Sequence, residues 1–235
     1  MNPKRLIAAA TLSLCAMGAF AQMSGASQPQ NVLQLSTTGT VEVQQDLLTL
    51  HLTTTREGPE AAAVQNQLKA ALDTALTEAK KAALPGQLDV RTGNFSLYPR
   101  YTRDQKISGW SGTAELVLEG RDFARITGTA AKIQTMTMGG VGFGLSREQR
   151  ARVEGEAQSL AIERFKAKAT ELAKGFGFSG YTLREVAVNS NDQGFARPPR
   201  IMAMELKSAQ ADSPVPVEAG KSSVVVTVSG SVQLR

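Results

Sequence analysis

The chain of 235 residues is poor in the residues that build reactive centres, because it has one cysteine, Cys15, and one histidine, His51. A single thiol makes no internal disulfide and no cysteine cage around a metal. A Ser-His-Asp triad would have to use His51, which lies within an alternating strand pattern, and no G-x-S-x-G motif is present. A zinc site would need several carboxylates, and these show no ligand spacing. We therefore predict no enzyme, and no catalytic, cofactor-binding or metal-binding residues.

The first 21 residues have the order of a secretory signal peptide. Two basic residues precede an apolar run over residues 6–17, and Ala19-Phe20-Ala21 forms a small-residue cleavage site. The run has about a dozen residues, fewer than the roughly 20 that a membrane-spanning helix needs. We therefore expect cleavage after Ala21 and a periplasmic protein of residues 22–235 that has no membrane span and no cysteine.

The charge balance argues against a nucleic-acid partner. Of the 26 basic residues, Lys4 and Arg5 lie in the signal peptide, and the others exceed the 21 acidic residues only slightly. Between residues 147 and 168, basic residues are interleaved with glutamates, which is typical of a solvated helix face. We expect no nucleic-acid binding.

Hydrophobic periodicity predicts an α+β fold. Apolar residues at steps of three and four indicate long helices near 59–83 and 146–176, and Asp122 can cap a short helix ending near Ile133. Alternating patterns indicate strands near residues 33–44, 48–53, 95–99, 113–118, 141–145, 181–188 and 224–234. We expect one domain over 22–235, with a largely antiparallel mixed sheet that carries two long helices and one short helix on one face.

The long helix near 146–176 has the clearest pattern. Ser146 and Gln149 form a capping box at its start. Along one face lie Val153, Ala157, Ala161, Phe165, Ala169, Leu172 and Phe176.

Two methionine pairs are the least ordinary feature of the chain. Met136 and Met138 lie in a strand pattern, where both would point to one face and fill the core. Met202 and Met204 lie between residues 189 and 220, where Asn, Ser, Gly and Pro cluster and a mobile loop is predicted. Thioethers there could bind Cu(I), absorb oxidant or dock on a partner.

The order of elements and their signatures resembles the SIMPL domain family over nearly the whole mature chain. The residues that carry the resemblance are Gly39-Thr40-Val41-Glu42-Val43 with Asp46, Thr92-Gly93-Asn94-Phe95-Ser96-Leu97-Tyr98-Pro99 with Tyr101, Ile107-Ser108-Gly109-Trp110, Ala167-Lys168-Ala169, Leu172-Ala173-Lys174 and Pro216-Val217-Glu218-Ala219-Gly220. Three positions depart from the family pattern. Gln45 replaces a usual proline, Trp110 replaces Tyr, and Gly180 ends the glycine turn differently.

The resemblance implies an envelope protein of the periplasm with no established enzymatic activity and no catalytic residues to transfer. It also implies a link to oxidative-stress defence in some members and protein interactions in distant eukaryotic relatives.

Three glycine-containing segments look like phosphate-binding motifs. Residues 175–180 match G-x-G-x-x-G, but they end a helix and precede a strand, the reverse of the order that a dinucleotide fold needs. Gly220-Lys221-Ser222 precedes a strand and lacks the first P-loop glycine. Residues 139–144 lie just before the helix start at Ser146, so their amides could bind an anion, although a closely packed strand explains them better.

Three functional hypotheses follow. The first is a non-catalytic periplasmic protein that acts by forming a homo-oligomer, or by binding an envelope protein, in envelope or oxidative-stress defence. The second is a small-ligand or Cu(I)-binding module that uses the glycine-rich strand or the loop with Met202 and Met204. The third is a hydrolase that depends on His51.

Overall fold

The computed structural model describes residues 30–191 and 217–235. Its elements are β1 (Val32–Gln44), β2 (Leu47–Gly58), α1 (Ala61–Ala82), β3 (Asp89–Tyr101), β4 (Ile107–Gly120), α2 (Phe123–Lys132), β5 (Thr137–Gly144), α3 (Arg147–Gly175), β6 (Tyr181–Asn191) and β7 (Lys221–Leu234). The predicted signal peptide lies outside the described residues. So does the part of the predicted loop over 192–216, while residues 189–191 complete β6.

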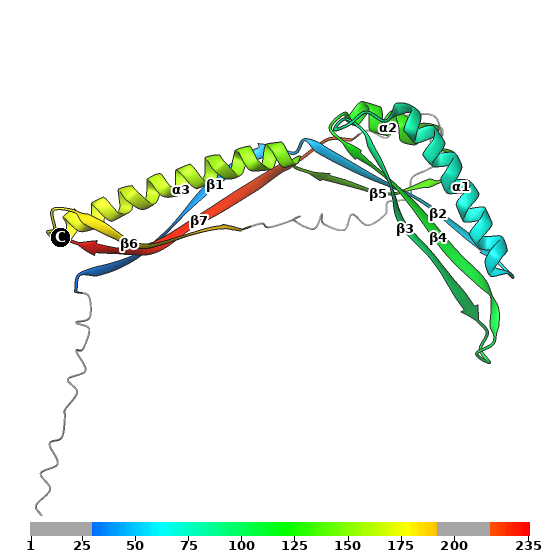
Figure 1. The fold of residues 1–235 in the computed structure, drawn as a ribbon, viewed down its shortest axis with the longest axis horizontal. Helices are drawn as coiled ribbons and strands as arrows, with labels where there is room; N and C mark the ends of the chain where they lie inside the picture. The colour runs from blue at the N-terminus through cyan, green and yellow to red at the C-terminus, as the bar shows by residue number, and fades with distance from the viewer. Residues whose placement is uncertain (1–29, 192–216) are drawn as a thin grey trace, which may run out of the picture.

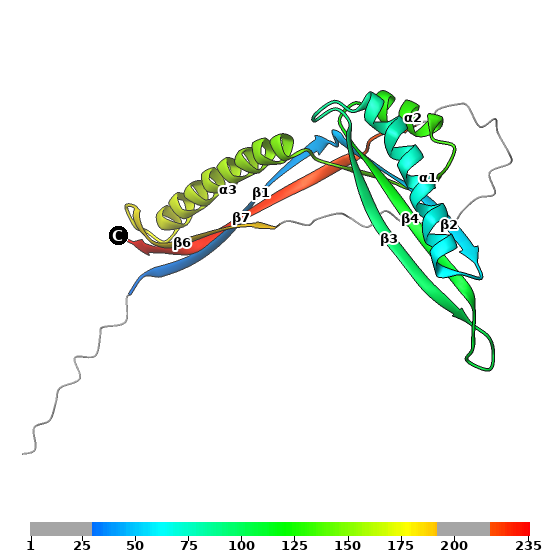
Figure 2. The same ribbon diagram turned by 45° about the vertical axis from the view of Figure 1, so that its right-hand side comes forward.

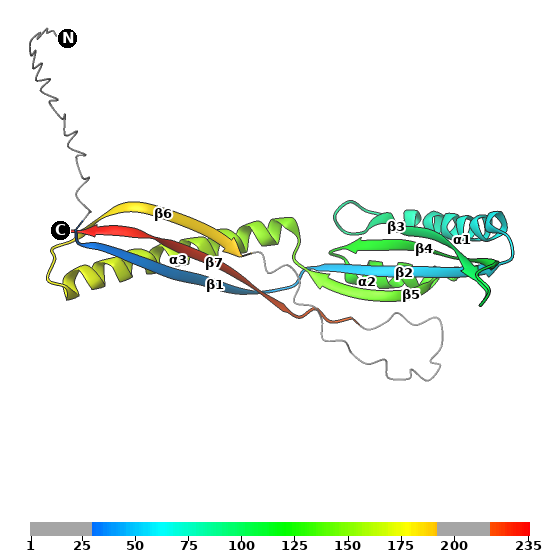
Figure 3. The ribbon, with the colours of Figure 1, turned by 90° about the horizontal axis from the view of Figure 1, so that it is seen from below.

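The predicted α+β class is confirmed, with two long helices and one short helix, but the strands form two antiparallel sheets instead of one. One sheet has the order β1-β7-β6 and the other β3-β4-β2-β5. Figure 1 shows that α3 lies along the first sheet and that α1 and α2 cover the second. Figures 2 and 3 show the two sheets following one another along the molecule. Hydrophobic alternation identifies a strand and its buried face, but it does not identify the strand's partners.

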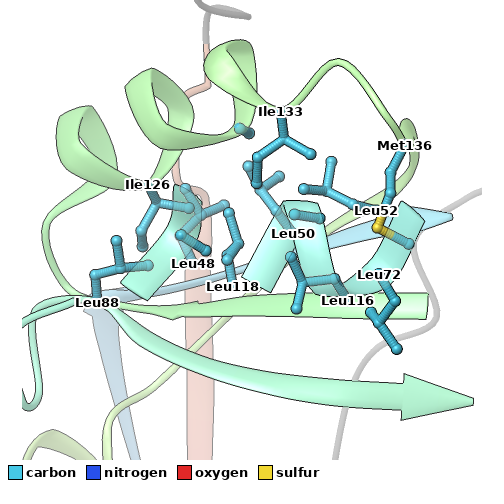
Figure 4. Close-up of a cluster of buried hydrophobic side chains, with 13 residues drawn as sticks. Leu48, Leu50, Leu52, Leu72, Leu88, Leu116, Leu118, Ile126, Ile133 and Met136 are labelled. Carbon is cyan, nitrogen blue, oxygen red and sulfur yellow. The ribbon is translucent and has the colours of Figure 1, made fainter. Parts of the chain in front are cut away.

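The four-stranded sheet contains the larger hydrophobic core. Leu48, Leu50 and Leu52 alternate along β2 toward the helices, as the period of a strand requires. They meet Leu116 and Leu118 of β4 and residues from α1 and α2. Figure 4 shows these side chains converging between the helices and the sheet. The other face of this sheet carries mostly polar side chains.

The three-stranded sheet is packed against the alanine-rich face of α3. Ala157 and Ala161 of α3 are fully buried, and these small side chains let the helix approach β1 closely. The approach is closest at Gly39, where a methyl group would lie 2.0 Å from the carbonyl oxygen of Ala157. The Thr37 hydroxyl donates to the carbonyl of Ala161 at 2.9 Å, and Arg164 donates to the carbonyl of Thr38.

The predicted N-caps at Asp122 and Ser146 are present, but the capping box is only half formed, because the Ser146 amide donates to Asp46 and not to the side chain of Gln149. The amide of Gln149 donates to the hydroxyl of Ser146, and the amide of Arg125 donates to the carboxylate of Asp122. At the end of α3, Gly177 has a positive φ, and the amide of the next residue returns to the carbonyl of Ala173. Phe176 was expected on the buried face, but it is the exposed C-cap residue, because the helix has already ended there.

The two sheets are joined at a small polar junction, which we define as Gln45, Asp46, Arg121, Ser146 and Gly220. The carboxylate of Asp46 accepts from the Ser146 amide at 2.7 Å and from its hydroxyl at 2.6 Å. Arg121 Nε lies 3.3 Å from the same carboxylate. The amide of Gln45 donates to the carbonyl of Gly220 at 3.0 Å. The junction therefore connects the β1–β2 link, the start of α3 and the segment before β7.

The close contact at Gly39 gives the first prediction. We expect Gly39→Ala to lower the free energy of unfolding by about 3 kcal/mol, because the added methyl group meets rigid backbone atoms of α3. Chemical denaturation measures the loss. Gly140→Ala is the matched control, since nothing lies within 4 Å of that position. Equal stability of the Gly39 variant and the wild type would contradict the close packing.

The junction gives the second prediction. We expect Asp46→Ala to cost about 2 kcal/mol of unfolding free energy, because a carboxylate is lost from the start of α3. Ser146→Ala should cost about 1 kcal/mol, and the double variant should lose less than the sum, since the two side chains form one network. Asp73→Ala, on the exposed side of α1, is the control. Strictly additive losses would show that the two residues act separately.

Candidate functional site

His51 lies on the polar face of the four-stranded sheet, where it is paired with a carboxylate. Its Nδ1 is 2.6 Å from Oε1 of Glu115, which lies on the neighbouring strand β4. The other oxygen of Glu115 accepts from the backbone amide of Asn94 at 2.9 Å. The Asn94 amide and then His51 hold the pKa of Glu115 below its ordinary value, because both favour the charged form. His51 therefore lies in a strand, as the alternating pattern predicted, and its ring is hydrogen-bonded to a carboxylate.

The surroundings of His51 do not form a hydrolytic triad. Such a triad needs a nucleophilic hydroxyl on the imidazole nitrogen opposite the carboxylate. Thr49, which shares the polar face of β2 with His51, donates to Glu119 and not to the imidazole. Within the described residues, the His51 imidazole is hydrogen-bonded to Glu115. This pair fixes the position of the His51 ring beside Glu115.

The structure describes the first of the two methionine pairs but not the second. Met136 is buried in the core of the four-stranded sheet, as predicted, but Met138 is 38% exposed at the edge strand β5. The expectation of a shared buried face is therefore wrong, because β5 begins only at Thr137 and Met136 precedes the strand. Met202 and Met204 lie outside the described residues. No group of three or more His, Cys, Asp or Glu in the described part of the chain could hold a metal.

The start of α3 is occupied by the chain itself. A helix N-terminus can bind an anion, and residues 139–144 made this a candidate site. Here the anion is the Asp46 carboxylate, which accepts from the amide of Ser146 and from its hydroxyl. The glycines belong to β5, and the other two phosphate-like motifs are the C-terminal turn of α3 and the start of β7. The structure therefore explains these three motifs as structural features.

An apolar groove remains between α3 and the edge strand β6. We call it the β6 groove, and it is formed by Ile162, Phe165 and Lys166 of α3, Leu183, Val186 and Val188 of β6, and Val228 of β7. Its volume is about 250 Å³. Leu183, Val186 and Val188 are 54%, 45% and 44% exposed. A bulge between Leu183 and Glu185 shifts the alternation, which explains why all three face the groove.

The sequence predicted the strand at β6 but not its place at the edge of a sheet. Among the described strands β6 pairs with β7 alone, so the backbone groups along its other edge have no strand partner there. Natural edge strands are usually short, charged, twisted by bulges or covered. The other edges follow this rule more closely, because β1 exposes mainly polar residues, β3 contains Pro99, and β5 is rich in glycine. In the sequence, the three aliphatic residues of β6 are the feature that could have indicated this apolar sheet edge.

Comparisons with known proteins identify a family but no activity. A family model named SIMPL, described as "Protein of unknown function (DUF541)", matches residues 33–232 and confirms the resemblance seen in the sequence. No curated protein matches the chain. A solved structure titled "The crystal structure of AtUAH in complex with glyoxylate" has a TM-score of 0.27 and 12% identity over 55% of this chain. The match spans 34% of that protein and is too weak to carry an argument. No described helix is long and apolar enough to cross a membrane.

The Glu115 interactions give the third prediction. We expect Glu115→Gln to lower the unfolding free energy by about 1 kcal/mol at neutral pH. The pKa of Glu115 is lower in the folded protein, so its contribution is present above the ordinary value of 4.5 and is lost as the pH falls through the folded pKa. Denaturation curves at several pH values measure this difference. Glu163→Gln, on the exposed side of α3, is the control, and a difference that grows toward low pH would contradict the assignment.

Proposed function

Because the chain belongs to the SIMPL family, whose function is unknown, we propose its role from its own surfaces: it is a non-catalytic periplasmic protein that acts by associating with another protein chain. The observation that carries this proposal is the β6 groove. The groove joins an apolar surface to a strand edge that pairs with no other strand among the described residues, and an added strand can use both. Main-chain hydrogen bonds would supply affinity, and the aliphatic side chains would supply the buried area.

The non-catalytic part of the proposal is supported by how the polar residues are used. His51 bonds to Glu115, and Glu115 also accepts from the backbone amide of Asn94 in β3. Asp46 caps α3 and contacts Arg121. The polar side chains that could have served catalysis therefore make hydrogen bonds and ion pairs within the fold.

Export is supported by the order of residues 1–21, in which two basic residues, an apolar run and Ala19-Phe20-Ala21 follow one another. Cleavage after Ala21 would remove no part of β1, which starts at Val32, and it would remove Cys15. A chain without cysteine needs no disulfide formation in an oxidising compartment, so its stability comes from packing. The role in envelope or oxidative-stress defence follows from the family resemblance, and association through the β6 groove is the mechanism that we propose for it.

The fourth prediction tests this function in cells. A strain that lacks the gene should regain survival in hydrogen peroxide when it expresses the wild-type chain. The double variant Val186→Lys/Val188→Lys should not restore survival, because two charges enter the surface that must be buried. Both residues are exposed, so the variant should keep its helical circular dichroism and thermal midpoint.

Ser36→Lys is the matched control, since it adds a charge to the opposite edge strand of the same sheet. It should protect the cells as the wild type does. Full protection by the double lysine variant would reject the β6 groove as the functional surface. A wild-type chain that gives no protection would reject the role in oxidative stress.

A further inference from the structure

We propose that the occupant of the β6 groove is the β6 groove of a second copy of this chain, with the two β6 strands paired antiparallel about a two-fold axis at Ala187. This inference rests on the proposed function, and it specifies the partner. An antiparallel pair of identical strands is compatible with a two-fold axis, so one surface serves both copies.

The register follows from the regular part of β6. Residues from Glu185 to Asn191 pair with β7 without interruption, whereas the bulge lies before Glu185. A two-fold axis at Ala187 uses this regular segment and places Val186 of each copy opposite Val188 of the other. Both valines face the groove, so their neighbours across the axis lie on the same side of the joined sheet. A shift by one residue would place them opposite side chains of the other face.

The position of α3 favours a second copy over a single added strand. α3 packs mainly on β1 and β7 and leaves the groove side of β6 uncovered. A lone strand would extend the sheet but leave this apolar row in water. A second copy brings its own α3 and its own row of aliphatic residues, so that a six-stranded sheet carries two helices on one face. Each copy then covers the surface that the other leaves open.

The charges on β6 permit this pairing. The described strand carries one cation, Arg184, and one anion, Glu185. Arg184 is bonded to the side chain of Gln233 on its own sheet at 3.1 Å. The groove itself carries a single charged side chain, Lys166, at the α3 wall. Two copies therefore meet without facing rows of like charges. Charged side chains are one of the means by which natural edge strands avoid pairing.

A single cysteine tests the arrangement. The chain purified after export should contain no cysteine, so Ala187→Cys supplies the only thiol. Residues opposite each other in an antiparallel pair have Cα atoms about 4.5–5.5 Å apart, within the range that a disulfide spans. Under mild oxidation by oxidised glutathione we expect Ala187→Cys to form a covalent dimer at least about tenfold faster than Ser36→Cys, which places the thiol on the opposite edge strand. Sedimentation of the wild type should give twice the mass of one chain, and Val186→Lys should give the mass of one.

Three results would overturn the inference: a wild-type monomer, equal cross-linking of the two cysteine variants, or a wild-type dimer that Val186→Lys leaves intact. These failures are distinguishable from failure of the proposed function. If the wild type is a monomer and the double lysine variant still loses protection in cells, the groove binds a different protein. If the dimer forms as described but the double lysine variant protects fully, the pairing is real and the proposed function is wrong.

Discussion

One carboxylate links the start of α3 to the segment between the two sheets. Asp46 lies between β1 and β2, and it receives the amide and hydroxyl of Ser146 where α3 begins. Arg121, just after β4, contacts the same carboxylate, and Gln45 bonds to the segment before β7. These contacts connect the chain segments that pass from one sheet to the other. They also hold Ser146, the N-cap residue of a 29-residue helix that is roughly 40 Å long, and Ser146 in turn accepts from the amide of Gln149.

The path of α3 over the three-stranded sheet determines which strand stays exposed, and this exposed strand forms the β6 groove that we assign to association. From its start at the junction α3 runs over β1, where Gly39 and the alanines of the helix allow close approach. A helix centred there packs mainly on β1 and β7 and contacts β6 least, so that the aliphatic residues of β6 are only partly covered. The exposed aliphatic residues of β6 are therefore a consequence of how α3 is held. The same packing that stabilises the three-stranded sheet leaves one apolar strand edge open, and an apolar edge of this kind is best satisfied by another protein chain.

Much of the local structure could be predicted from the sequence, because it depends on neighbours along the chain. The alternation in β2, the periodicity of α1 and α3, and the caps at Asp122 and Ser146 are of this kind. The division into two sheets could not be predicted, since strand pairing joins residues as distant as Leu33 and Val232. The role of Asp46 was hidden for the same reason, because Ser146 lies 100 residues away. The aliphatic residues of β6 were visible as a strand pattern, but only the position of α3 shows that they lie uncovered.

Amide hydrogen exchange measures whether β6, which among the described strands pairs only with β7, also pairs with β6 of a second copy. Exchange should be followed in peptides from β6 and β1 of the exported protein over a wide range of protein concentration. The account predicts that β6 amides exchange more slowly as concentration rises, because pairing protects them, while β1 amides keep the same rate. Exchange of β6 that stays independent of concentration, or protection that develops at β1 instead, would contradict the account.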